Sequence, residues 1–168
     1  MKKYVYELKM KVRDYECDSQ GIVNNANYQH YMEHTRHEFI MSRGIRFSEL
    51  YEQGVVPVVA RISIEYKTPL RGGDEFVSKL NVRKEGVRYI FDQDIYRADD
   101  GRICVKAHVE CVCLVNGRLK VHEAFDKIIE SWKYKVTKSL DLVTLFLIKH
   151  YVQPADFSLD AIVRSSKA

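Results

Sequence analysis

The stretch VRDYECDSQGIVNNANYQHYMEHTR, residues 12–36, decides the fold of this chain. Its first half is polar, and it surrounds Asp18 with glycine and asparagine, residues that favour turns and helix caps. The sequence therefore predicts an ordered loop that leads into a helix. Backbone N–H groups at a helix N-terminus favour negative charge. Asp18 is then either the anion that the helix stabilises or one side of a reactive site.

The second half of the stretch begins a long helix with one mostly apolar stripe. Helical spacing relates six of its residues: Tyr28, Tyr31, Met32, Thr35, Phe39 and Ile40. One of the asparagines at 24, 25 and 27 is expected to cap the start of this helix, and Gly44 to end it. A shorter helix is expected over residues 47–54, with Ser48 as its cap and Gly54 as its stop.

Beyond the helices the apolar period changes to two, which is typical of β-strands. Strands are expected over residues 3–13, 60–67, 75–85, 87–97 and 103–115. The last is the clearest, because alternate residues from Ile103 to Val115 are apolar and share one face. Short connections imply antiparallel pairing. We therefore expect an α+β fold in which one curved antiparallel sheet packs against the long helix.

Length and composition describe one ordinary globular domain with a real core. The chain has 168 residues, of which 46% are hydrophobic and 30% are charged. A net charge of +4 is too small to argue for nucleic acid, although it suits an anionic small ligand. No apolar run reaches signal-peptide or membrane-spanning length, so we expect a cytoplasmic protein with reduced cysteines. Cys111 and Cys113 are expected to pack in the core.

The end of the chain differs from the rest. We divide the sequence into a domain over residues 1–132 and a C-terminal extension over residues 133–168. The segment SLDLVTLFLIKHYV, residues 139–152, is apolar on most sides, and we expect it to be helical. Residues 154–168 are expected to form a loop or a loose terminus.

Two landmarks resemble the 4-hydroxybenzoyl-CoA thioesterase family, which has the hotdog fold. In residues 12–36 the family signature is matched by Asp18, Gly21, Val23, Tyr28, Glu33 and Arg36. The second landmark, EYKTPLRGGDEF at residues 65–76, matches it through Pro69, Arg71 and Asp74. The resemblance covers about residues 1–130 and implies a hotdog fold, with a curved sheet wrapped around one long central helix.

The resemblance also implies an activity, namely hydrolysis of an acyl-CoA thioester by a homodimer or homotetramer without a cofactor. It assigns the catalytic acid to Asp18 and the N–H group that polarises the carbonyl to Asn25. Many relatives have Tyr-His where this chain has Asn24-Asn25, so a histidine-assisted mechanism is excluded there. An Asn-Asn pair resembles the loop of plant acyl-acyl carrier protein thioesterases, which leaves the carrier open.

The expected site follows from the chemistry of thioester hydrolysis. The reaction needs a nucleophile or general base beside the carbonyl carbon, and donors at the oxygen where charge develops. Asp18 fits the first role and the helix start at Asn25 the second; direct attack and activation of water both remain open. Glu33 either orients water or pairs on the surface with Arg36 or His37. The expected substrate contacts are Gly21, Val23, Asn24, Tyr28 and Arg71.

Three alternatives compete with this interpretation. His30, Glu33 and His34 match the H-x-x-E-H zinc motif, but the sequence identifies no further ligand, and we assign no metal. Cys17 is a conceivable nucleophile, although no histidine is tied to it. A non-catalytic hotdog protein that binds acyl thioesters is the third. Apolar residues on both sheet faces favour a dimer.

Overall fold

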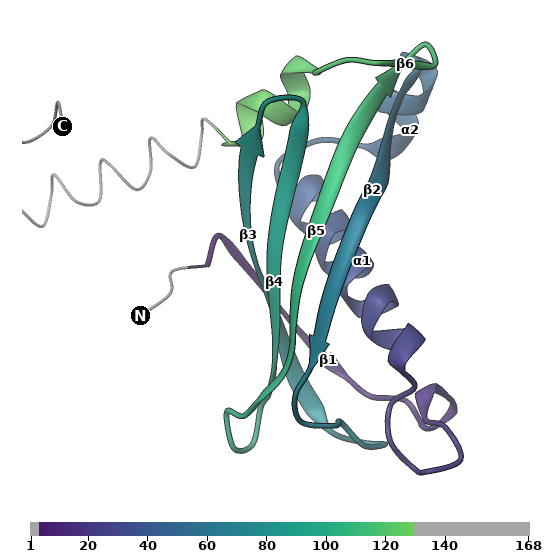
Figure 1. Ribbon diagram of the computed structural model, residues 1–168, viewed down its shortest axis with the longest axis vertical. Helices are drawn as coiled ribbons and strands as arrows, with labels where there is room; N and C mark the ends of the chain where they lie inside the picture. Colours follow the sequence, from purple (N-terminus) through teal and green to yellow (C-terminus); the bar gives the residue numbers. More distant parts are fainter. Residues whose placement is uncertain (1–3, 130–168) are drawn as a thin grey trace, which may run out of the picture. The chain divides into compact units, whose positions relative to one another are not determined.

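The computed structural model describes residues 4–129, which form one curved antiparallel sheet with a long helix on one face (Figure 1). The strands are β1 (Tyr6–Lys11), β2 (Val55–Tyr66), β3 (Glu75–Glu85), β4 (Arg88–Arg97), β5 (Ile103–Val115) and β6 (Arg118–Leu119). The helices are η1 (Asp14–Glu16), α1 (Asn25–Met41) and α2 (Phe47–Glu52), and residues 123–129 are also helical. The strand order is β1-β3-β4-β5-β2, with β6 beside β5. This is the predicted α+β architecture.

Several boundaries differ from the expectation. The first strand is shorter than residues 3–13, and β2 starts at Val55 rather than at residue 60. Ser48 does not cap α2, because it lies inside the helix and Arg46 occupies the N-cap position without a side-chain hydrogen bond. The expectations for residues 133–168 lie outside the described residues.

Strand β2 begins before the predicted residue 60 and includes Pro57, which an edge strand can accommodate. Pro57 pairs with Cys113 of β5, and β2 is the last strand of the sheet on that side. A proline cannot donate to a ladder, so it is accommodated where one strand edge has no neighbour. Among the described strands nothing pairs with the outer edge of β2.

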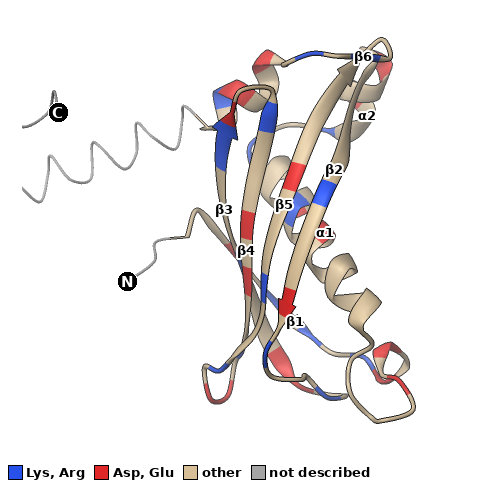
Figure 2. Ribbon diagram, in the orientation of Figure 1, with Lys and Arg blue, Asp and Glu red and all other residues tan. Residues whose placement is uncertain are grey.

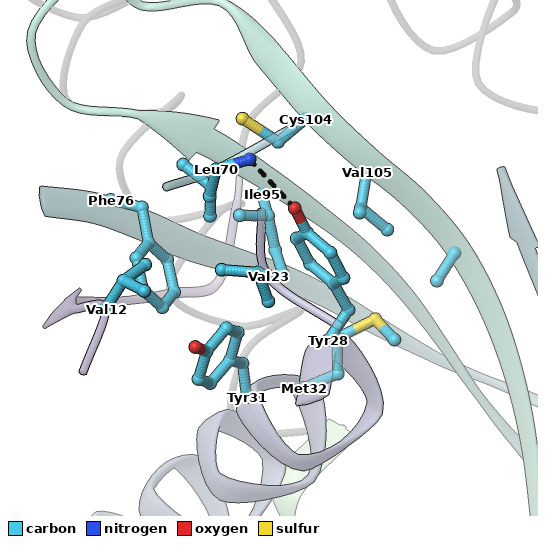
Figure 3. Packing of buried hydrophobic residues seen from close by; sticks show 11 residues of the cluster. Val12, Val23, Tyr28, Tyr31, Met32, Leu70, Phe76, Ile95, Cys104 and Val105 are labelled. Atoms are coloured by element: carbon cyan, nitrogen blue, oxygen red, sulfur yellow. Dashed lines mark hydrogen bonds between the residues drawn. The ribbon is translucent and has the colours of Figure 1, made fainter. Parts of the chain in front are cut away.

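The core lies between α1 and the concave side of the sheet. The predicted stripe is confirmed, since all six of its residues are buried. Figure 3 shows Tyr28, Tyr31 and Met32 of α1 against Phe76 and Val105 of the sheet. The Tyr28 hydroxyl accepts a hydrogen bond of 3.0 Å from the backbone N–H of Leu70. The beginning of α1 is therefore fixed by packing against the sheet and by a buried polar contact to the connection between β2 and β3.

The sheet carries charged side chains along its strands (Figure 2). On β4, Asp92 accepts from Arg83 and lies 2.9 Å from the His108 ring. On β5, Glu110 pairs with Arg88 at 3.2 Å. In residues 4–129 no helix has the length and apolar character needed to cross a bilayer.

Candidate active site

A tight turn fixes Asp18 in the loop before α1. The N–H of Gly21 donates to the carbonyl of Asp18 at 3.0 Å, and Asp18 N–H donates to the Ile22 carbonyl at 2.8 Å. Gly21 has a φ of 71°, a left-handed conformation that glycine adopts most readily. The carboxylate Oδ1 of Asp18 accepts from the N–H of Gln20 at 2.8 Å. These bonds hold the carboxylate in one place relative to the loop backbone.

Glu16 connects this loop to the helix. It is only 7% exposed, and its Oε2 accepts from the N–H of Arg13 and from the Tyr31 hydroxyl, both at 2.7 Å. Burial, and next the bond to Glu16, raise the pKa of Tyr31, which keeps its hydroxyl protonated as a donor. The Glu16 carbonyl accepts from Asn24 N–H at 2.9 Å and from Asn27 Nδ2 at 2.7 Å. Sequence reasoning missed this anchor, since an isolated glutamate in a polar loop gives no sign of burial.

Asn24 caps the helix, as one of the three asparagines was expected to do. Its side-chain oxygen accepts from the backbone N–H of Ala26 at 3.0 Å. Helix α1 then starts at Asn25, whose own N–H has no preceding carbonyl within the helix to bond to. The site therefore has a backbone donor at the positive end of the helix dipole.

Asp18 and Asn25 line the same cavity, which has a volume of about 300 Å³. Its wall is formed by Asp18, Ile22, Val23, Asn25, Tyr28, Tyr66, Lys67, Thr68, Pro69 and Cys104. The structure thus brings a carboxylate and a helix start together at one small, mostly apolar cavity. Of the expected substrate contacts, Val23 and Tyr28 line it, whereas Gly21, Asn24 and Arg71 do not.

Two tyrosines form one side of the cavity. The Tyr66 hydroxyl donates to the Asn25 carbonyl at 3.2 Å, and its ring lies 5.7 Å from that of Tyr28 in an edge-on arrangement. Tyr66 is not among the residues predicted for the site. Alternation within residues 60–67 puts it on the same strand face as Ile62 and Ile64, but only the fold shows that β2 ends beside the start of α1.

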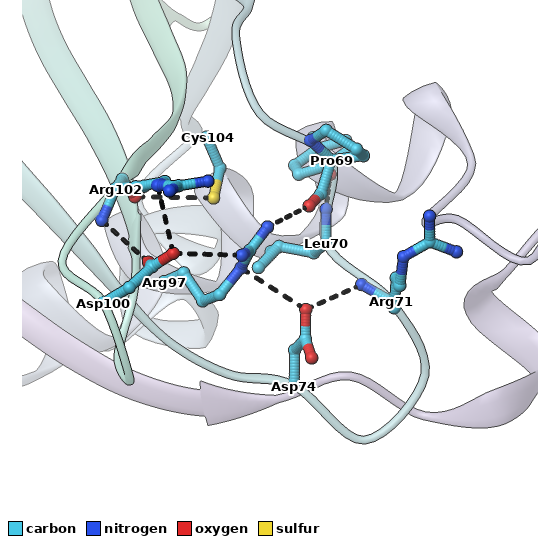
Figure 4. Close-up of polar contacts among 9 residues, drawn as sticks. Pro69, Leu70, Arg71, Asp74, Arg97, Asp100, Arg102 and Cys104 are labelled. Atoms are coloured by element: carbon cyan, nitrogen blue, oxygen red, sulfur yellow. Dashed lines mark hydrogen bonds and ion pairs between the residues drawn. The ribbon is translucent and has the colours of Figure 1, made fainter.

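The second landmark, residues 65–76, forms part of the cavity wall and is held by a set of polar contacts (Figure 4). Arg97 donates to the Pro69 carbonyl at 2.7 Å and lies 3.6 Å from the Asp74 carboxylate. Asp74 in turn accepts from the backbone N–H of Arg71 at 2.9 Å. The Arg71 side chain extends away from Arg97 in Figure 4, and its backbone pairs with Ile22 of the Asp18 loop. The landmark residues therefore position this loop mainly through backbone contacts.

Glu33 lies away from the Asp18 cavity within one chain. It follows Asn25 by eight residues, which corresponds to ~12 Å along the helix axis. Its carboxylate is 3.8 Å from His37, one of the two surface partners expected for it, and both residues line a different cavity.

Two alternatives remain, Cys17 as a nucleophile and the H-x-x-E-H motif as a zinc site. Cys17 is half-buried and does not line the Asp18 cavity. His30 and His34 face another hollow, beside Tyr31. Across residues 4–129 no group of three or more His, Cys, Asp or Glu side chains has the arrangement of a metal site.

Comparison with known proteins shows which family this chain resembles. The model of the thioesterase-like superfamily matches residues 12–140. A chloroplastic acyl-acyl carrier protein thioesterase of Arabidopsis thaliana is 37% identical over 112 residues, or 66% of this chain. Those residues cover 59% of that relative, so the chain spans about three fifths of its length.

Solved structures share the fold. A hypothetical protein of Aquifex aeolicus is 28% identical with a TM-score of 0.69, and the likeness covers 74% of this chain and 98% of that one. A 1,4-dihydroxy-2-naphthoyl-CoA thioesterase of Synechocystis has a TM-score of 0.70 at 16% identity. The likeness covers 74% of this chain and 94% of that one. The predicted hotdog fold is confirmed by these matches.

Proposed function

This chain belongs to the thioesterase-like superfamily, and we propose that it hydrolyses an acyl-CoA thioester to the free acid and CoA. The observation that carries the proposal is the shared cavity, in which the carboxylate of Asp18 and the start of α1 at Asn25 face the same space. The two sequence landmarks support a position near the 4-hydroxybenzoyl-CoA thioesterases.

In the proposed reaction the thioester carbonyl oxygen lies at the N–H of Asn25. That donor is part of the backbone, so it needs no reorganisation when negative charge develops on the oxygen. Asp18 either attacks the carbonyl carbon or takes a proton from the water that does so. Its Oδ1 is bonded to Gln20, whereas Oδ2 accepts no hydrogen bond from any described residue and is available for this step. The carbon–sulfur bond then breaks and the thiolate leaves. On the direct route, water then hydrolyses the mixed anhydride between Asp18 and the acyl group, which releases the free acid and restores the carboxylate. On either route the proton that water loses is the one that protonates the thiolate.

A second candidate is hydrolysis of the same acyl group from acyl carrier protein. The Arabidopsis relative, named as an acyl-acyl carrier protein thioesterase, favours this candidate, as does the Asn24-Asn25 pair. The Synechocystis neighbour is named for a CoA ester, but its likeness concerns the fold alone. Measuring kcat/KM for one acyl chain on both carriers separates the two candidates.

We also propose that the protein is a homodimer, or a tetramer built from dimers, joined along β2. The open edge of β2 exposes Val56, Val59 and Tyr66, the last of which belongs to the candidate site. A second β2 strand would cover this edge. Glu33, distant from Asp18 within one chain, would take part in hydrolysis only if a second copy supplied it. A compact monomer in sedimentation at micromolar concentration would contradict the dimer.

The decisive experiment is Asp18→Asn in steady-state hydrolysis with a panel of acyl-CoA esters. Asparagine retains the size of aspartate and the acceptor for Gln20, but it neither attacks a thioester nor accepts a proton at neutral pH. We expect kcat to fall by at least ~100-fold, the low end for loss of a positioned base, with little change in thermal stability.

Cys17→Ser is the matched control, because it changes the neighbouring side chain outside the cavity. It should retain activity. If Asp18→Asn stays within a few-fold of the wild-type rate, or if Cys17→Ser is folded and inactive, the mechanism is wrong. A wild-type protein that binds acyl-CoA without releasing thiol would instead be the non-catalytic binding protein considered above.

A further inference from the structure

Tyr66 is the last residue of β2 and lies at the wall of the Asp18 cavity. The end of the strand is held in the sheet, because the following N–H, that of Lys67, donates to the Cys104 carbonyl at 2.8 Å. The Tyr66 ring lies edge-on to the ring of buried Tyr28, with 5.7 Å between the ring centroids. The strand and the ring contact together hold the Tyr66 side chain in one position.

The Tyr66 hydroxyl extends from the sheet to the start of α1. It donates to the backbone carbonyl of Asn25 at 3.2 Å. In an α-helix this carbonyl also accepts from the N–H four residues later, that of Gln29, and a carbonyl oxygen has lone pairs for both donors. The helix is complete without the hydroxyl, so the bond from Tyr66 acts on where the helix start lies relative to the cavity wall.

The N–H of Asn25 is the donor that the proposed reaction uses, and it shares a rigid peptide plane with the Asn24 carbonyl. That carbonyl accepts from the N–H of Asn27 at 2.9 Å, and the N–H of Ala26 donates to the Asn24 side chain at 3.0 Å. Both bonds lie within the loop and the first turn, so they move with the helix start. The Tyr66 hydroxyl instead connects the backbone of Asn25 to the sheet.

We propose that Tyr66 is a positioning residue for hydrolysis, whose hydroxyl keeps the N–H of Asn25 aimed at the thioester oxygen without touching the reacting atoms. This inference rests on the proposed hydrolysis at Asp18. A preorganised donor stabilises charge that develops in the transition state, and a displaced donor loses part of that effect. The ground-state carbonyl carries much less charge. Loss of the hydroxyl should therefore lower kcat and leave KM nearly unchanged.

Tyr66→Phe tests the hydroxyl alone, because phenylalanine keeps the ring that contacts Tyr28 and forms the cavity wall. With the best substrate of the acyl-CoA panel, kcat should fall ~10-fold, less than the ~100-fold or more for loss of a whole oxyanion donor. KM should stay within about two-fold of wild type, as for an interaction made in the transition state. Tyr66 is 49% exposed, so the variant should fold with an unchanged midpoint of urea unfolding.

Tyr15→Phe is the matched control. Tyr15 is 78% exposed, and its hydroxyl makes no hydrogen bond with any residue in 4–129. Both kinetic constants should stay at their wild-type values. If folded Tyr66→Phe keeps the wild-type kcat, raises KM alone, or loses no more than Tyr15→Phe, the role of Tyr66 is wrong and hydrolysis at Asp18 still stands. A wild type that hydrolyses neither acyl-CoA nor acyl-acyl carrier protein would overturn both.

NMR follows the contact itself, independently of the reaction. The carbonyl carbon resonance of Asn25 should move upfield in Tyr66→Phe, because a carbonyl that loses a hydrogen-bond donor is less polarised. The resonance of the Phe39 carbonyl, in the last turns of α1, should not move. If the Asn25 resonance stays in place, the hydroxyl does not hold this carbonyl in solution, and the proposal is wrong whatever the rates.

Discussion

The two ends of α1 hold two cavities that are built differently. At the N-terminal end the polar groups come largely from a loop and from backbone: the Asp18 carboxylate, the Glu16 anchor and the helix start at Asn25. In the C-terminal half the polar groups are side chains, with Arg36 bonded to Gln93 across the core. The first cavity is smaller, about 300 Å³, and the second about 550 Å³.

This difference indicates that the two halves of one helix present charge in different ways. Unpaired N–H groups at the N-terminus can stabilise charge that appears only during a reaction. A buried guanidinium carries its charge permanently, and here the Gln93 side chain holds it in the core. Perturbing the loop should therefore change the rate, whereas perturbing the Arg36–Gln93 pair should change stability.

The largest expected effect on stability is that of Gln93→Leu. It removes the side-chain oxygen that accepts from buried Arg36, the one hydrogen-bond acceptor that Arg36 has among residues 4–129, and the donor to the Met32 carbonyl. Loss of one partner of a buried charge costs about 3 kcal/mol of unfolding free energy. Urea unfolding measures it, and kcat of the folded fraction should stay near wild type.

Gln29→Leu is the control for that comparison, because it makes the same change at an exposed position of α1. Its unfolding free energy should stay within about 0.5 kcal/mol of wild type. A loss of kcat in folded Gln93→Leu would mean that the two halves of the helix are coupled, and the separation drawn here would be wrong.

Glu16→Leu should affect both stability and rate. It leaves the Arg13 N–H and the Tyr31 hydroxyl without an acceptor. Unsatisfied donors of this kind lower the free energy of unfolding by about 2 kcal/mol. It also loosens the loop that holds Asp18, so kcat should fall by at least ~10-fold, since small misplacements of reacting groups are costly. Glu16→Gln keeps an acceptor and should recover most of both losses. A rate that stays at wild-type level in Glu16→Leu would show that Asp18 is positioned without this anchor.

The sequence predicted the elements better than it predicted the sites. Period-two alternation placed β3 and β5 at their observed bounds, and helical spacing identified the buried stripe of α1. These patterns report the burial of each residue on its own element. The position of Tyr66 beside Asn25 and the burial of Glu16 depend instead on how separate elements meet. Arg36 sits next to the apolar stripe, but a charged residue there gives no sign of whether it is exposed or buried.

The smallest effect we predict concerns the helix cap. Asn24→Ala removes the acceptor for the Ala26 N–H, and loss of an N-cap side chain costs about 1 kcal/mol. The rate should fall less than for Glu16→Leu, because the N–H of Asn25 remains in place and only the fraying of the first turn increases. Asn24→Ser keeps a capping oxygen and should restore the unfolding free energy measured in urea. If Asn24→Ala instead lowers kcat as far as Asp18→Asn while Asn24→Ser does not, the Asn24 side chain acts on the reacting carbonyl itself, and the donor assigned to the backbone of Asn25 would be the wrong one.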